Sequence, residues 1–261
     1  PNSLTHLTMT TSPHRHSVLF LSGASILLAA LTTTVAWALV QLINLITNLA
    51  FYQRASFLSV TPAENQMGLA VVVVPVIGGL IIGVMARYGS KAIRGHGIPE
   101  AMEQILLNRS RIPARITVLK PVSAAISIGT GGPFGAEGPI IATGGALGSL
   151  LGQIFSVTAS ERKTLLAAGA AAGMAAIFGS PVSAVLLAIE LLLFEFSARS
   201  LVPVALACAT ASAVRLWFFG SEPIFVMPEV QVTGPAFLFT FCVLGACVGV
   251  AATFISRAVY L

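Results

Sequence analysis

The chain has 261 residues, of which 56% are hydrophobic and only 9% are charged, and its formal net charge is +5. Soluble domains carry roughly 25% charged residues, so this composition excludes a soluble enzyme, a disordered chain and a nucleic-acid-binding domain. It predicts instead a helical integral membrane protein that crosses the bilayer several times, with basic residues flanking the spans.

Long stretches without a charged residue mark the candidate membrane spans. They cover 38 residues from 16 to 53, 22 residues from 65 to 86, and 27 residues from 230 to 256. Each is long enough to cross a bilayer core, which needs about 20 helical residues, and the first predicts a tilted helix or one with an interfacial extension. The apolar stretches between residues 120 and 215 are broken by Gly and Pro, so their backbone must be buried in protein or line a watery cavity.

The basic residues predict the orientation of the chain in the membrane. Seven of the fourteen lie in the window 87–120. Because basic residues collect on the cytoplasmic side, this window and the tail of residues 1–16 are predicted to be cytoplasmic. Two crossings, by residues 18–51 and 67–86, would return the chain to the same side, so the two assignments agree.

Glycines spaced by four residues predict close helix packing. They are Gly144, Gly148 and Gly152 in one stretch, and Gly169 and Gly173 in the next. Such spacing lets two helix backbones approach each other, so we interpret these glycines as packing residues without a direct function. The three cysteines, Cys208, Cys242 and Cys247, all lie in apolar stretches and are predicted to be small buried residues, not disulfide or metal sites.

Two short sequences predict helix starts inside the membrane. GHGIPE spans residues 95–100 and GAEGP spans residues 135–139, and both place Gly shortly before Pro. Proline is favoured at the first helical position, and glycine permits a close backbone approach. At membrane depth, the free N–H groups and the positive dipole end of such a helix need an anion, and broken helices of transporters use this arrangement.

Glu137 lies directly before the Gly-Pro pair of the second helix start. A carboxylate at membrane depth costs at least about 2.5–3.5 kcal/mol on insertion scales, so it is either protonated or occupies the anion site itself. By competing with a permeant anion for the same N–H groups, it would serve as both a gate and a proton acceptor. The alternative is a fixed helix cap that those N–H groups satisfy.

Three segments, GHGIPE, GPFGAEGPI and GAAAGMAAIFGSPVSAVLLAIE, closely resemble, in this order, motifs of the CLC family of voltage-gated chloride channels and chloride/proton antiporters. The resemblance implies an all-α membrane fold of two inverted repeats of tilted and broken helices, assembled as a homodimer with one anion pathway per subunit. It divides the transmembrane domain, residues 17–261, into a first repeat at 17–225 and the start of a second at 231–261, with the remainder of the pore domain absent.

The resemblance also implies residue roles. Glu137 corresponds to the gate and proton acceptor. The anion-binding residues would be Gly95, His96, Gly97, Ile98, Pro99, Gly135, Ala136, Gly138 and Pro139.

Three departures from the family pattern bear on function. His96 stands where the family usually carries Ser, which puts chloride selectivity in doubt unless the ring packs away from the pore. Leu191 follows Glu190 where antiporters generally carry a second glutamate; Glu195 could substitute on an internal proton route, although a solvent-facing charge at a helix end is the favoured interpretation. Glu190 is expected to be buried. The Gly-x-Phe-x-Pro motif and pore tyrosine of the second repeat do not occur.

The leading hypothesis is transmembrane transport of chloride, or a related anion, by a channel or a proton-coupled exchanger. The alternatives are a non-conducting fragment or structural homologue, an anion transporter with altered selectivity, and a membrane-embedded enzyme, which lacks any nucleophile elbow or HExxH motif here. We expect no cofactor, metal ion, catalytic residue or nucleic-acid partner, and we expect the lipid bilayer and a second copy of the chain as partners.

Overall fold

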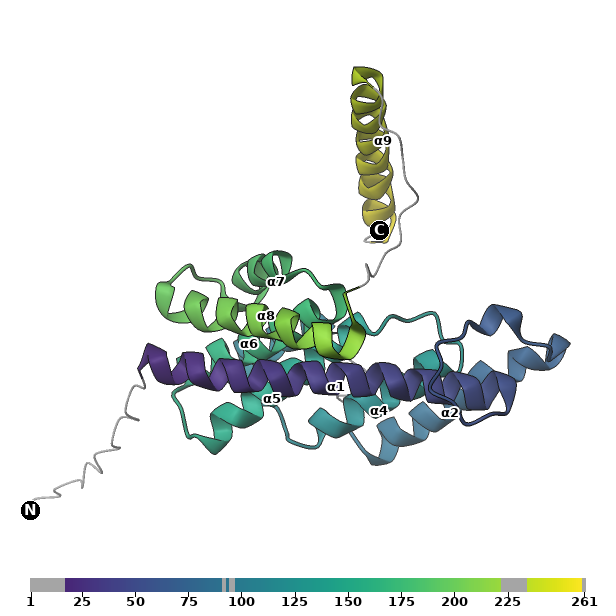
Figure 1. Ribbon diagram of the computed structural model, residues 1–261, viewed down its shortest axis with the longest axis horizontal. Coiled ribbons are helices and arrows are strands. Elements are labelled where there is room, and N and C mark those ends of the chain that lie inside the picture. The colour runs from purple at the N-terminus through teal and green to yellow at the C-terminus, as the bar shows by residue number, and fades with distance from the viewer. Residues whose placement is uncertain (1–16, 91–92, 94–96, 222–233, 260–261) are drawn as a thin grey trace, which may run out of the picture. The chain divides into compact units, whose positions relative to one another are not determined.

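The computed structural model describes residues 17–90, 93, 97–221 and 234–259, which are the coloured segments of Figure 1. These residues contain no strand, so the predicted all-α class is confirmed over the described part of the chain. The elements are α1 (Val18–Tyr52), η1 (Pro62–Glu64), η2 (Gly68–Val72), α2 (Val73–Tyr88), α3 (Gly97–Leu107), α4 (Ile116–Gly129), α5 (Glu137–Ile154), α6 (Ala159–Phe178), α7 (Pro181–Leu187), η4 (Ala188–Leu193), α8 (Ala198–Phe219) and α9 (Pro235–Val259). The short elements η1 and η2 are 3-10 helices, and η4 is a π-helix.

Four helices among the described residues are long and apolar enough to cross a membrane, namely Val18–Tyr52, Gly68–Tyr88, Ala198–Phe219 and Phe237–Val259. Three of them occupy the charge-free stretches that the sequence marked as spans. The first is a single helix of 35 residues, longer than the roughly 20 residues that an upright crossing needs. The Ser17 side chain caps its start by accepting a hydrogen bond from the Phe20 N–H, and its end coincides with a left-handed conformation at Gln53.

The chain divides into two compact units, residues 1–222 and 223–261. This boundary is close to the predicted junction between a first and a second repeat, although the assignment of the units as inverted repeats stays a prediction. In the second unit, α9 is exposed along its described side chains. Consequently Cys242 and Cys247 are exposed, and the prediction that they are buried is wrong, whereas Cys208 on α8 is buried as predicted.

Within the first unit, α6 is the most enclosed helix, and it contacts α1, α5, α7 and α8. Figure 1 shows α1 and α8 running side by side, with α6 behind them. A capping box fixes the start of α6: the Thr158 hydroxyl accepts from the Glu161 N–H, and the Glu161 carboxylate accepts from the Thr158 N–H. The alanines that follow are almost completely buried, which gives α6 a narrow surface on which its neighbours can pack closely.

The backbones of α5 and α6 touch at the glycines that the sequence singled out. A Cβ on Gly144 would meet the carbonyl of Gly169, and a Cβ on Gly148 would lie 2.6 Å from the Leu165 carbonyl carbon. A Cβ on Gly173 would lie 2.9 Å from the Ile140 carbonyl oxygen. The predicted close packing is therefore confirmed, and it fixes the position of α5, which carries Glu137 at its start.

Candidate functional site

The starts of α3 and α5 lie against each other in the first unit. α3 begins at Gly97 and α5 begins at Glu137. Gly97 has a left-handed φ of 47°, and a Cβ on it would lie 2.7 Å from the Gly138 Cα. Both the backbone angle and the close approach require glycine at position 97. The two motifs that the sequence predicted to start helices are thus in backbone contact.

Each helix begins two residues before its proline. Pro99 is the third residue of α3, and Pro139 is the third residue of α5. The predicted helix starts are confirmed, but the placement of proline at the first position is wrong by two residues. Both helices tolerate a proline at the third position, because the first four N–H groups of a helix have no intrahelical partner. A proline in the first turn therefore removes no hydrogen bond.

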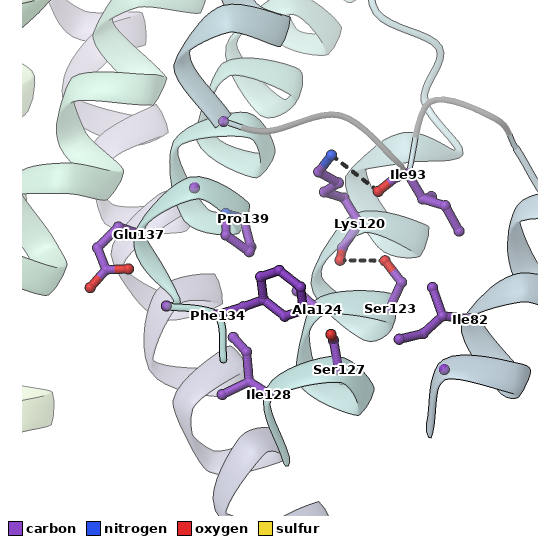
Figure 2. Close-up of a pocket in the computed structure, with 14 residues that line it drawn as sticks. Ile82, Ile93, Lys120, Ser123, Ala124, Ser127, Ile128, Phe134, Glu137 and Pro139 are labelled. Atoms are coloured by element: carbon purple, nitrogen blue, oxygen red, sulfur yellow. Dashed lines mark hydrogen bonds between the residues drawn. The ribbon is translucent and has the colours of Figure 1, made fainter. Parts of the chain in front are cut away.

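A cavity of about 500 Å³ lies beside these two helix starts, and Figure 2 shows its lining. Its walls come from α2, α4 and the starts of α3 and α5, and most of the lining side chains are apolar. Ser123 and Ser127 contribute hydroxyl groups. Among the described lining residues, Lys120 is the one basic side chain and Glu137 is the one acidic side chain.

The Glu137 carboxylate is folded back over Gly135. A Cβ on Gly135 would overlap the carboxylate, so glycine at this position makes room for it. The side chain is half-buried and forms no hydrogen bond or ion pair with a described residue. The alternative of a fixed cap, bonded to the N–H groups of α5, is therefore not supported. In Figure 2 the carboxylate points away from Lys120. Glu137 thus lies at the start of α5 as a carboxylate without a hydrogen bond or ion pair to a described residue.

Lys120 and Glu100 form an ion pair that the sequence interpretation missed. The Lys120 ammonium group lies 2.6 Å from the Glu100 Oε2 and also donates to the Ile93 carbonyl at 3.4 Å. Both side chains are largely buried, with 4% and 13% of their surfaces exposed. The sequence interpretation treated Lys120 only as one of the basic residues in the window 87–120, which is predicted to be cytoplasmic. Its place within the apolar run ITVLKPVSAA was the available signal, because an ionisable residue inside an apolar helix of a membrane protein is a functional candidate.

The remaining predicted anion-binding residues fall into two groups. Gly95 and His96 lie outside the described residues. Ile98 and Pro99 belong to the first turn of α3, and Ala136 is the residue before α5, so the described members of both segments lie at the two touching helix starts.

The two acidic residues predicted for an internal proton route do not line this cavity. Glu190 lies in η4 and is exposed, so the prediction that it is buried is wrong. It shares an exposed face with Val182 and Leu186, at a spacing of four residues, and no described residue covers this face. Glu195 is also exposed, and its carboxylate lies 3.6 Å from the Lys163 ammonium group. This position agrees with a charge at a helix end that reaches solvent.

Comparison with known proteins identifies relatives along most of the chain. A family described as "Voltage gated chloride channel" matches residues 78–261. The chain is 29% identical over 182 residues to a ClcB-like chloride channel protein of Ralstonia nicotianae, and 33% identical over 184 residues to the H(+)/Cl(−) exchange transporter ClcA of Vibrio campbellii. These alignments cover 68% and 66% of the chain but 42% and 39% of the relatives, so the chain spans less than half of their length.

Solved structures show the same fold. The chain superposes on a slow cyanobacterial Cl−/H+ antiporter with a TM-score of 0.72 and 23% identity, over 91% of this chain and 55% of the antiporter. It superposes on a CLC-type fluoride/proton antiporter with a TM-score of 0.65 and 23% identity, over 85% and 52% of the two chains. The fold is therefore the all-α CLC membrane fold. Since the family match extends over well more than half of its residues, the chain belongs to the voltage-gated chloride channel (CLC) family.

Proposed function

We propose that this chain supplies the first repeat of a CLC-type anion transporter, either a chloride channel or a chloride/proton exchanger. The observation that carries the proposal is the contact between the starts of α3 and α5 beside a cavity, with the unpaired Glu137 carboxylate at the same place. Helix starts present free N–H groups and a positive dipole end, which together bind anions.

In the proposed mechanism, the N–H groups of residues 95–98 and 135–138 bind the permeant anion, and Glu137 competes for them. An ionised Glu137 occupies the site and excludes the anion by like-charge repulsion. A protonated Glu137 has no charge, so it leaves the N–H groups to the anion. The same side chain is therefore a gate in a channel and a proton acceptor in an exchanger.

The names of the relatives decide neither whether anion transport is coupled to protons nor which anion is carried. Their names include a chloride channel protein, an H(+)/Cl(−) exchange transporter and a fluoride/proton antiporter. We propose chloride as the anion and protons as the second substrate of an exchanger. In that case a proton that reaches Glu137 also needs acceptors away from the cavity, and Glu190 and Glu195, which do not line the cavity, are the acidic residues proposed for that internal route.

The assembly in the membrane is also a proposal. We place the N-terminus in the cytoplasm, because the basic window of residues 87–120 then faces the cytoplasm as well. We propose a homodimer whose contact includes the exposed apolar side chains of Val182 and Leu186 on α7. An apolar face that carries a carboxylate such as Glu190 is better covered by protein than by lipid tails.

The test is anion flux from liposomes that contain the protein in its full natural length. We expect chloride efflux above that of protein-free liposomes. Uphill proton movement driven by a chloride gradient identifies an exchanger, whereas chloride flux without proton movement identifies a channel. Folded, reconstituted protein that carries neither chloride nor fluoride would contradict the proposed function and favour a non-conducting homologue.

Replacing His96 with serine is expected to change relative anion permeability. A neutral imidazole donates one N–H and a protonated one donates two, and only the protonated ring attracts anions by charge. The variant should therefore shift the chloride-to-fluoride permeability ratio and lose any pH dependence that histidine gives to this ratio. The ratio is measured from reversal potentials in bilayers. Identical selectivity in the two proteins would remove His96 from the pathway.

A further inference from the structure

A single buried ammonium group ties α4 to the start of α3. The Lys120 side chain contacts the Ile93 carbonyl, which precedes Gly97 in the chain, and the carboxylate of Glu100, which lies in the first turn of α3. The Lys120 ammonium group thus contacts one residue before Gly97 in the sequence and one residue after it. Because both charged side chains are largely buried, water competes little for this pair.

The helix that carries Lys120 is itself firmly placed. α4 contacts α1, α2 and α5. A Cβ on Gly129, at the end of α4, would lie 2.7 Å from the Ile46 Cβ of α1. The Ser123 hydroxyl donates to the Lys120 carbonyl at 3.0 Å, within the same helix (Figure 2). Lys120 therefore extends from a packed helix, so it is able to hold the start of α3 in place.

The start of α3 also has little freedom on its other side. Gly97 is in backbone contact with Gly138, and a side chain on Gly97 would collide with that backbone. A small displacement of α3 would therefore change the distance between the two helix starts, and with it the direction of their free N–H groups.

We propose that Lys120 and Glu100 form a positioning pair that sets the start of α3 against the start of α5. This inference rests on the proposed function, in which those helix starts bind the anion. The pair acts through geometry, because the positive charge of Lys120 is already matched by Glu100. Figure 2 places the ammonium group on the Ile93 side of the cavity, while the Glu137 carboxylate points away from Lys120.

A direct electrostatic role for Lys120 and a positioning role predict opposite effects of one variant on chloride binding. Glu100→Gln keeps the size of the side chain but removes the charge that neutralises Lys120. If Lys120 attracted the anion directly, this variant would bind chloride more tightly. If the pair positions α3, the weaker contact loosens the helix start, and chloride binds less tightly.

The experiment compares Lys120→Met, Lys120→Arg and Glu100→Gln in the full-length protein, reconstituted in liposomes. We expect Lys120→Met and Glu100→Gln to lower chloride affinity by about tenfold and to shift the chloride-to-nitrate permeability ratio. Lys120→Arg keeps the ion pair and should stay within about threefold of the wild type. The permeability ratio does not depend on how much protein is folded, so it separates positioning from a general loss of stability.

Arg199→Gln is the matched control. It breaks the Arg199–Glu161 ion pair of 3.0 Å, in which the Glu161 side chain is 2% exposed, and neither residue lines the cavity. This variant should leave the chloride affinity and the permeability ratio unchanged. Tighter chloride binding by Glu100→Gln, or an unchanged ratio in Lys120→Met, would overturn the positioning role.

Hydrogen exchange provides a readout that does not need transport. The N–H groups in the peptide 97–107, which is α3, should exchange faster in Lys120→Met than in the wild type, and not faster in Arg199→Gln. Equal exchange in Lys120→Met and the wild type would also overturn the proposal. If the wild type carries no anion, the proposed function fails, and hydrogen exchange still decides whether the pair positions α3.

Discussion

The Glu137→Ala variant is expected to retain anion flux and to lose all proton coupling. Alanine removes the carboxylate that lies at the start of α5, so nothing competes with the anion for the N–H groups of the two touching helix starts. It also removes the only acidic group among the described residues that line the cavity, and with it the proton acceptor. Chloride efflux should therefore continue, with its pH dependence abolished, while proton uptake falls to the level of protein-free liposomes.

Glu103→Ala serves as the control for this variant. Glu103 is an exposed carboxylate on α3 that does not line the cavity, so its removal alters the net charge equally but leaves the site intact. Chloride and proton fluxes, recorded together by two electrodes, should match the wild type in this control. A Glu137→Ala protein that is folded but blocks chloride would show that the gate assignment is wrong.

A companion variant, Gly135→Ala, moves the Glu137 carboxylate without removing it. The new methyl group would occupy the place where the carboxylate now lies, and a flexible side chain can swing away at little cost. We expect chloride flux to rise above the wild type, with weaker pH dependence and with some proton transport retained. Fluxes that match the wild type would show that the carboxylate position over Gly135 has no part in gating.

Three of the candidate membrane spans, α1, α2 with η2, and α9, could be predicted from the sequence, because the absence of charged residues over a long stretch marks each of them. Uninterrupted charge-free stretches are costly outside a bilayer or a core, and α1, α2 with η2, and α9 occupy such stretches. The contact between α5 and α6 was also predictable, because glycines at a spacing of four place bare backbone on one helix face. The bounds of the helices between them were not predictable, since Gly and Pro interrupt these helices and tertiary contacts decide where each begins.

The site was predictable in its parts but not in its assembly. The Gly and Pro residues indicated two helix starts, and no local pattern could show that Gly97 touches Gly138, because that contact depends on how α3 and α5 pack. The ion pair between Lys120 and Glu100 was missed for the same reason.

Glu190 was assigned to the wrong environment because apolar neighbours in the sequence were interpreted as burial. The structure places it on the π-helix η4, directly after α7, where its side chain is exposed. The face that carries Glu190 is covered by no described residue, so a local apolar sequence was a poor guide to its exposure.

Replacing Gly148 with valine is expected to lower the free energy of unfolding more than any of the other substitutions described above. A Cβ at this position would lie 2.6 Å from the Leu165 carbonyl carbon and 2.9 Å from the Leu166 Cα, and both atoms belong to the backbone of α6. A backbone cannot swing aside as a side chain can, so α5 and α6 must separate and lose contact along their length. Overpacking usually costs about 1–3 kcal/mol, and we expect at least about 3 kcal/mol here.

The measurement is the free energy of unfolding in mixed micelles, from a titration with a denaturing detergent. Gly83→Ala on α2 is the control, because a Cβ there meets no atom within 4 Å. Replacing a helical glycine with alanine stabilises a helix by roughly 0.5–1 kcal/mol, so the control should be at least as stable as the wild type. If Gly148→Val unfolded at the same detergent fraction as Gly83→Ala, the backbone contact between α5 and α6 could not be what holds the start of α5, and Glu137 with it, in place.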